Sequence, residues 1–302
     1  MNNILLIFLY LAIGLVLQRL KAVPVTKLYK KLNKIVIYIC LPALALFYIP
    51  KIHWDNKLLY PISVAWIAFV GSYLLFQILG KRYGWSKKLI GCLIITAGLG
   101  NTSFLGYPII QALYGEEGMK TAILVDQPGS FVVLSTLGIL VATLYSKGNQ
   151  NAGEIAKKIL LFPPFLSFGV ACVMNVSGFD FEQLVQSSLK LLGSGVTPLA
   201  LISVGLQLRF ETRSQHWKFL GLGLLYKLIL TPAIIYILYV VVLDQKSQII
   251  EVAILEAGMA PMITACILAS DHGLKPRLSS MMIGFGIPAS FISLIFWYFI
   301  VH

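Results

Sequence analysis

One stretch inside an apolar block decides the fold: from Thr96 to Pro108 the chain reads TAGLGNTSFLGYP. The block around it covers residues 89–113, and about 20 apolar residues are enough for a helix to cross a bilayer. Three glycines, three consecutive polar residues and a proline interrupt this block. Proline removes a backbone donor and clashes with the preceding helical turn. Because unpaired backbone groups are costly in lipid, we expect the interruption to face protein or a water-filled cavity.

A second apolar block, 248–270, is interrupted in a similar way and reads EAGMAPMIT from Glu256 to Thr264. For either block alone, close packing of small residues with a proline kink is an adequate explanation. Two matching interruptions by Gly and Pro, however, are the best indication in a sequence of a transporter's binding site.

The remainder of the chain is equally apolar. Of its 302 residues 58% are hydrophobic and only 12% are charged, whereas about a quarter of the residues of a soluble globular protein are charged. The sequence therefore predicts an all-α integral membrane protein with ten transmembrane helices, of which the fourth and ninth are broken. The spans are expected at 3–18, 35–50, 58–79, 89–113, 119–145, 159–176, 188–207, 219–243, 248–270 and 278–301.

The basic residues predict the orientation. Most of the 24 lysines and arginines fall in the loops after odd-numbered spans, and positively charged loops stay in the cytoplasm. We therefore expect a multi-pass protein of the cell membrane with both termini extracytoplasmic. The net charge of +12 follows from these loops. It does not form the basic face of a nucleic-acid binder, so no nucleic-acid partner is expected.

Two pairs of similar segments indicate an internal duplication. LPALAL at Leu41–Leu46 matches TPLALI at Thr197–Ile202, and PGSF at Pro128–Phe131 matches PASF at Pro288–Phe291, at nearly the same separation. Because each copy would hold five spans, an odd number, the two copies have opposite orientation, as in many secondary transporters.

This duplication predicts the domain organisation. The first five-helix repeat is expected at 1–147, a polar cytoplasmic linker at 148–157, and the second, inverted repeat at 158–302.

Few ionisable residues lie inside the predicted spans. They are Asp126, Lys190, Lys227 and Glu256, and each costs at least about 2.5 kcal/mol at the bilayer centre. Glu256 lies beside an interruption, which favours a functional role. Asp126 could be a structural charge paired with Lys227, and both lysines could extend their ammonium groups to the membrane surface.

At these residues the chain resembles a known family. NTSFLGYP at Asn101–Pro108 and DQPGSF at Asp126–Phe131 resemble the auxin efflux carriers, which include plant auxin exporters and bacterial carriers of malonate and similar acids. EAGM at Glu256–Met259 resembles the sodium-site segment of the related bile acid:sodium symporters. The resemblance covers essentially the whole chain.

The resemblance implies that spans 4 and 9 cross at mid-membrane. Spans 1, 2, 6 and 7 would form a scaffold that also makes a homodimer, and spans 3–5 and 8–10 a transport domain that moves by an elevator mechanism. The plant exporters carry Asn-Pro at both crossings. Here Asn101 is followed by Thr102, and Met259-Ala260 precedes Pro261, so auxin itself is in question as the substrate.

We predict a secondary transporter that moves a small organic anion, an auxin-like or malonate-like mono- or dicarboxylate, by alternating access driven by an ion gradient or the membrane potential. N-termini of half-helices suit a carboxylate. The expected substrate-binding residues are Asn101, Thr102, Ser103, Tyr107, Pro108, Gly258 and Pro261. The expected coupling-ion residues are Glu256, Asp126 and Gln127, with Glu256 as the ligand if the ion is sodium. Sodium and a proton are equally compatible with the sequence, and no other cofactor is expected.

Two other functions are compatible with the sequence, and a third is not. An anion channel could share broken helices but needs no duplicated, movable half, and a sodium-coupled symporter could carry a larger, bile-acid-like anion. An intramembrane enzyme is excluded because the four histidines fall in loops or at the terminus and the spans hold no pair of aspartates. The four cysteines have no zinc-site or disulfide spacing and are expected to be buried: Cys40, Cys92, Cys172 and Cys266.

Overall fold

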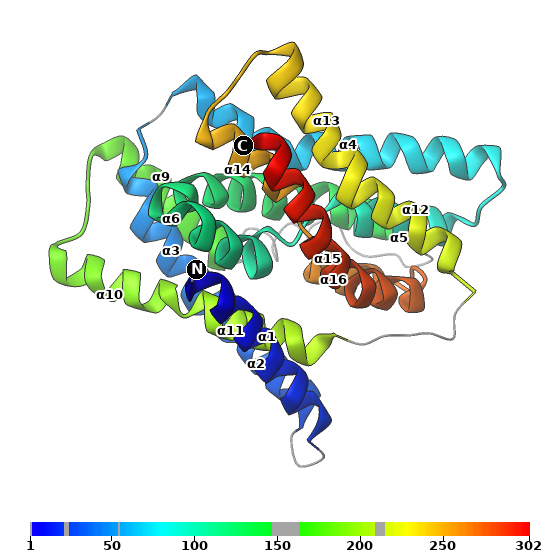
Figure 1. Ribbon diagram of the computed structural model, residues 1–302, viewed down its shortest axis with the longest axis horizontal. Coiled ribbons are helices and arrows are strands. Elements are labelled where there is room, and N and C mark those ends of the chain that lie inside the picture. The colour runs from blue at the N-terminus through cyan, green and yellow to red at the C-terminus, as the bar shows by residue number, and fades with distance from the viewer. Residues whose placement is uncertain (1, 21–23, 54, 147–162, 209–214) are drawn as a thin grey trace. The chain divides into compact units, whose positions relative to one another are not determined.

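The computed structural model describes residues 2–20, 24–53, 55–146, 163–208 and 215–302 (Figure 1). Apart from one isolated bridge, every regular element in these ranges is a helix. The chain divides into two compact units, each assembled from separate segments. Unit 1 comprises Met1–Asn56, Ser103–Ile123 and Lys158–Leu208, and unit 2 comprises Lys57–Thr102, Leu124–Lys157 and Arg209–His302.

Unit 1 is built around the N-terminal helix and the helices that follow the middle of the chain. Its helices are α1 (Asn2–Arg19), α2 (Val25–Ile35), α3 (Leu41–Tyr48), most of α6 (Tyr107–Leu124), α9 (Pro163–Ser177), α10 (Gln183–Ser194) and α11 (Val196–Gln207). Figure 1 shows α1 lying along α11. The two backbones approach closely because Gly14 and Gly205 face each other: a Cβ on Gly14 would lie 2.3 Å from the carbonyl oxygen of Ile202.

Unit 2 contains the longer helices and both interrupted segments. Its α-helices are α4 (Leu59–Arg82), α5 (Lys87–Gly98), α7 (Ile139–Tyr145), α12 (Trp217–Leu225), α13 (Thr231–Tyr236), α14 (Gln248–Ala257), α15 (Ile263–Asp271) and α16 (Pro276–Val301). Wider π-helical turns join several of them, namely η5 (Val125–Phe131), η6 (Leu134–Gly138), η7 (Tyr226–Leu230) and η8 (Ile237–Val242). Such turns are frequent at functional sites, and η5 accommodates Pro128, which cannot donate a backbone hydrogen bond.

Six helical stretches in the described residues are long and apolar enough to cross a membrane: Val25–Lys51, Asn56–Arg82, Thr102–Tyr145, Gln183–Gln207, Trp217–Val242 and Pro276–Val301. Shorter apolar helices cover Leu5–Arg19 and Pro163–Ser177. The stretch Thr102–Tyr145 bends at Gly115, which adopts φ 62° and ψ −148°, so a turn separates its two limbs. The protein is therefore a multi-pass, all-helical membrane protein.

The distribution of side chains suits a lipid environment. Large apolar side chains are exposed along several helices, for example Val176 at 82% and Phe299 at 76%, while charged groups such as Asp126 and Glu256 are buried. A soluble domain rarely exposes so much contiguous apolar surface.

Three expectations need correction. The helix of the second predicted span begins at Val25 rather than near residue 35, and that of the seventh at Gln183 rather than near 188. Hydropathy marks only the part of a helix that lies in lipid, whereas backbone hydrogen bonding continues past it. Cys172 is partly exposed rather than buried. The predicted linker at 148–157 lies outside the described residues.

Candidate functional site

Both predicted interruptions are present, and they pair with each other. Helix α5 ends at Gly98, and Leu99 is extended with φ −119° and ψ 132°. Helix α14 ends at Ala257, and α15 begins at Ile263 after the extended residue Met262. Between these helix ends Gly100 and Pro261 form an isolated antiparallel bridge.

The backbone of the crossing is satisfied by hydrogen bonds between the two interrupted segments. The amide of Asn101 donates to the carbonyl of Ala260 at 2.7 Å, and the amide of Met262 donates to the carbonyl of Leu99 at 3.0 Å. Two short extended segments can therefore be buried with little loss of free energy. Each segment supplies backbone hydrogen-bond partners to the other, in place of those that a continuous helix would have supplied.

Small residues make room for this crossing. A Cβ on Gly286, in α16, would lie 2.6 Å from Cδ of Pro261, and a Cβ on Gly98 would lie 3.1 Å from side-chain atoms of Phe69 and Ser72. Neighbouring helices thus press directly on the backbone of the two broken helices, which fixes the crossing in position.

The Asp126 carboxylate ties η5 to the crossing. It is fully buried and accepts a hydrogen bond from Oγ1 of Thr102 at 2.5 Å and one from Nε2 of Gln127 at 3.0 Å. Donors of this kind are what a buried carboxylate requires. Thr102, expected to bind the substrate, and Gln127, expected at the coupling-ion site, therefore both donate to Asp126.

Glu256 lies in the last turn of α14 and is 1% exposed. Neither of its carboxylate oxygens has a hydrogen-bond partner among the residues that the structure describes. It interacts electrostatically with Asp126 and with Lys227. A buried carboxyl group without partners is costly to maintain and is therefore an indication of function.

Lys227, in η7, is also buried at the crossing. It is 1% exposed, and its Nζ donates a hydrogen bond to the carbonyl oxygen of Ala257 at 2.6 Å. The expectation that this ammonium group extends to the membrane surface is therefore wrong, because a carbonyl at the end of α14 provides a nearer partner. Its position inside the apolar block 219–243 was the signal in the sequence that should have marked it as a site residue.

The remaining predicted substrate residues belong to unit 1. Ser103, Tyr107 and Pro108 are buried there. Asn101, Thr102, Gly258 and Pro261 lie in unit 2 together with Glu256, Asp126 and Gln127.

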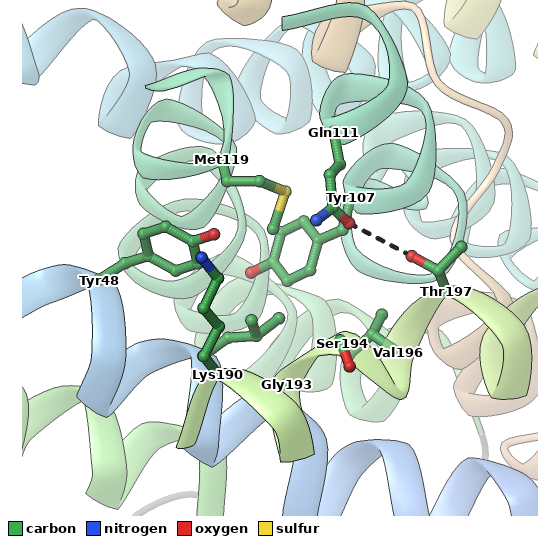
Figure 2. Close-up of a pocket in the computed structure, with 10 residues that line it drawn as sticks. Tyr48, Tyr107, Gln111, Met119, Lys190, Gly193, Ser194, Val196 and Thr197 are labelled. Atoms are coloured by element: carbon green, nitrogen blue, oxygen red, sulfur yellow. Dashed lines mark hydrogen bonds between the residues drawn. The ribbon is translucent and has the colours of Figure 1, made fainter. Parts of the chain in front are cut away.

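Tyr107 borders a small pocket of about 50 Å³ within unit 1 (Figure 2). The pocket is lined by Leu44, Tyr48, Tyr107, Gln111, Met119, Lys190, Gly193, Ser194, Val196 and Thr197. Figure 2 shows the Tyr107 ring between Lys190 and the pair Gln111–Thr197, in which Thr197 Oγ1 donates to Gln111 Oε1 at 3.4 Å. Lys190 also forms an ion pair with Glu116, and both side chains are about half exposed, as expected for a lysine that reaches the surface.

Hard cations prefer several oxygen ligands, and the described residues contain no group of three or more His, Cys, Asp and Glu side chains able to hold a metal. Carbonyls at a helix break are the usual supplement, but that of Ala257 already accepts the Lys227 ammonium.

Comparison with known proteins decides the family. Residues 1–298 match the profile of a family described as membrane transport protein, and plant auxin efflux carriers are among the similar proteins. The chain belongs to the auxin efflux carrier family.

Members of this family are membrane transporters and not enzymes. The similar proteins are likewise named as transporters or auxin efflux carriers. An uncharacterized transporter of Methanocaldococcus jannaschii is 28% identical over 276 residues, which are 89% of this chain and 88% of that protein. An uncharacterized transporter of Methanothermobacter thermautotrophicus is 27% identical over 273 residues, 88% of this chain and 87% of that one. Auxin efflux carrier component 8 of Arabidopsis thaliana is 25% identical over 270 residues, covering 73% of this chain and 72% of the plant protein.

Proposed function

We propose that this membrane transporter is a secondary carrier that moves a small organic anion, a mono- or dicarboxylate, by alternating access. The observation that carries the proposal is the crossing of two interrupted helices at Gly100 and Pro261, with the buried carboxylates of Asp126 and Glu256 beside it. Broken helices of this kind form the substrate and ion sites of secondary transporters.

The anion site follows from the helix ends at the crossing. Helix α15 begins at Ile263, two residues after the bridged Pro261, and its N-cap residue Met262 provides no side-chain hydrogen bond to the first amides. The positive end of a helix dipole with amides that lack a side-chain cap is suited to a carboxylate. Asn101, whose backbone amide donates to the carbonyl of Ala260, is proposed to contribute its side-chain amide. Thr102, Gly258 and Pro261 complete the proposed site in unit 2.

Within unit 1, Ser103, Tyr107 and Pro108 are also proposed as substrate-binding residues. Tyr107 already borders a pocket there, which supports a role in contact with the substrate.

Glu256 is the proposed coupling residue. Its carboxylate is buried and has no hydrogen-bond partner among the described residues, so uptake of a proton or a cation would lower its desolvation cost. Asp126 differs because Thr102 and Gln127 already stabilise its charge. Glu256 therefore responds to an ion gradient more readily than Asp126 does.

The proposed architecture has ten transmembrane helices in two inverted five-helix repeats. Contacts within unit 1 support this architecture. Helix α1 of span 1 packs on α11 of span 7, and α9 of span 6 packs on α3 of span 2. Exchanging the two repeats turns span 1 into span 6 and span 7 into span 2, so the two contacts are equivalent. The two units also support a scaffold of spans 1, 2, 6 and 7 and a transport domain of spans 3–5 and 8–10, except that 103–123 groups with unit 1. Both termini are proposed to be extracytoplasmic; tags reachable only from the cytoplasm would contradict this.

Thermal-shift screening of the purified protein tests the substrate class. Malonate, other dicarboxylates and indole-3-acetate are added separately, and a ligand at about 100 times its Kd stabilises the folded state by about 2.7 kcal/mol. We expect one of these acids to raise the melting temperature in the wild type and to do so less in Asn101→Ala. No shift with any organic anion would contradict the proposal. Single-channel currents in planar bilayers would instead favour an anion channel.

A further inference from the structure

The hydrogen bond from Lys227 places a positive charge at the C-terminal end of α14. The carbonyl of Ala257 is among the last of that helix, where the helix dipole is negative and where carbonyls lack a partner within the helix. A cation at this position satisfies one such carbonyl. It also lies close enough to Glu256 for a favourable electrostatic interaction.

Gly100 on the other broken helix admits this ammonium group. A Cβ on Gly100 would lie 3.0 Å from Nζ and 3.2 Å from Cε of Lys227. Gly100 has no need of glycine for a left-handed backbone, because it is not among the glycines with positive φ. Its missing side chain therefore serves the close approach of Lys227 to the crossing.

From this geometry we propose that Lys227 is a tethered cation that takes the place of a bound sodium ion at the crossing, so that the carrier works without sodium. The proposal rests on the crossing being the transport site. Lys227 binds the Ala257 carbonyl, which would otherwise be open to a metal ion, and it interacts electrostatically with Glu256.

The test measures cation binding without any knowledge of the substrate. The melting temperature of the purified protein is determined in sodium chloride and in choline chloride at equal ionic strength. We expect equal values for the wild type. Lys227→Ala removes the ammonium and leaves space beside the Ala257 carbonyl. The melting temperature of Lys227→Ala should therefore be higher in sodium chloride, or after addition of n-butylammonium, than in choline chloride. The increase should saturate with the concentration of the added cation.

Lys227→Met is the matched control, because methionine fills the volume without a charge and should show no dependence on the cation. If Lys227→Ala does not fold, Gly100→Ala serves instead: it keeps the lysine but pushes Nζ away from the carbonyl, and it should gain the same sodium dependence.

Two results would overturn the inference: stabilisation of the wild type by sodium over choline, or a folded Lys227→Ala protein that neither sodium nor n-butylammonium stabilises. The proposed function fails by a different result, namely the absence of any response of the wild type to organic acids.

Discussion

Replacement of Gly286 by alanine tests whether the crossing is as tightly packed as the structure shows. The new Cβ would lie 2.6 Å from Cδ and 3.0 Å from Cγ of Pro261, and 3.0 Å from a methyl group of Leu224. The Leu224 side chain can rotate away. The Pro261 ring cannot, because its backbone is bridged to Gly100 and the amide of the next residue, Met262, is bonded to Leu99.

Overpacking of a rigid interior costs about 1–3 kcal/mol, and a loss of this size lowers the melting temperature by a few degrees. Because the strain falls on Pro261, next to the proposed anion site, Gly286→Ala should also weaken the stabilisation by malonate or indole-3-acetate, whichever acid the wild type binds. Differential scanning fluorimetry of detergent-purified protein, with and without the acid, gives both quantities.

Gly221→Ala is the matched control, since Gly221 is exposed on α12 and nothing lies within 4 Å of its Cβ position. That variant should melt at the wild-type temperature or slightly above it, because alanine favours the helix over glycine. Equal melting temperatures for Gly286→Ala and Gly221→Ala would refute the close packing of α16 on the crossing.

Substitutions at three further positions probe individual side chains. Thr102→Val removes the hydroxyl that donates to buried Asp126 and should destabilise the protein by about 1.5–3 kcal/mol, whereas Thr102→Ser should retain most of the stability; equal melting of the two variants would show that the bond contributes nothing. Asn101→Ala should lose about 1–3 kcal/mol of binding free energy, and a Kd for the acid unchanged within about twofold would remove Asn101 from the site. Glu256→Gln keeps the shape but loses charge and titration, so proteoliposomes should exchange substrate yet fail to accumulate it. Wild-type accumulation under both sodium and proton gradients would shift the coupling role to Asp126.

The sequence alone predicted the main features of the fold because membrane insertion leaves a strong signal in it. Glycine, proline and polar residues inside two apolar blocks marked the interruptions, and the structure places them at Leu99–Asn101 and Gly258–Met262. Helix ends outside the lipid were less predictable. The amphipathic segment Val25–Ile35 is a helix that continues into the apolar segment after it. Its mean hydropathy is too low for a hydropathy pattern to mark it as part of a membrane span.

The burial of two candidate site residues could be anticipated from the sequence. Glu256 and Asp126 were identified from their types and positions, since charges inside apolar blocks are rare. The hydrogen bonds from Thr102 to Asp126 and from Lys227 to Ala257 were not predicted, because they join residues that the sequence separates by a helix or more. The space at Gly100 that admits Lys227 likewise depends on how two distant helices cross, and no local pattern contains that information.

Counterflow in proteoliposomes tests the central claim most directly. Vesicles that contain the purified transporter are loaded with unlabelled malonate, or in a parallel set with indole-3-acetate, and diluted into a trace of the same labelled acid. A carrier that alternates its access must exchange one anion for another, so we predict a transient accumulation of label above the equilibrium level that saturates with internal acid and is reduced in Asn101→Ala. Label that enters both sets only to equilibrium, at a rate independent of the internal acid, would contradict carrier-mediated exchange of these organic anions.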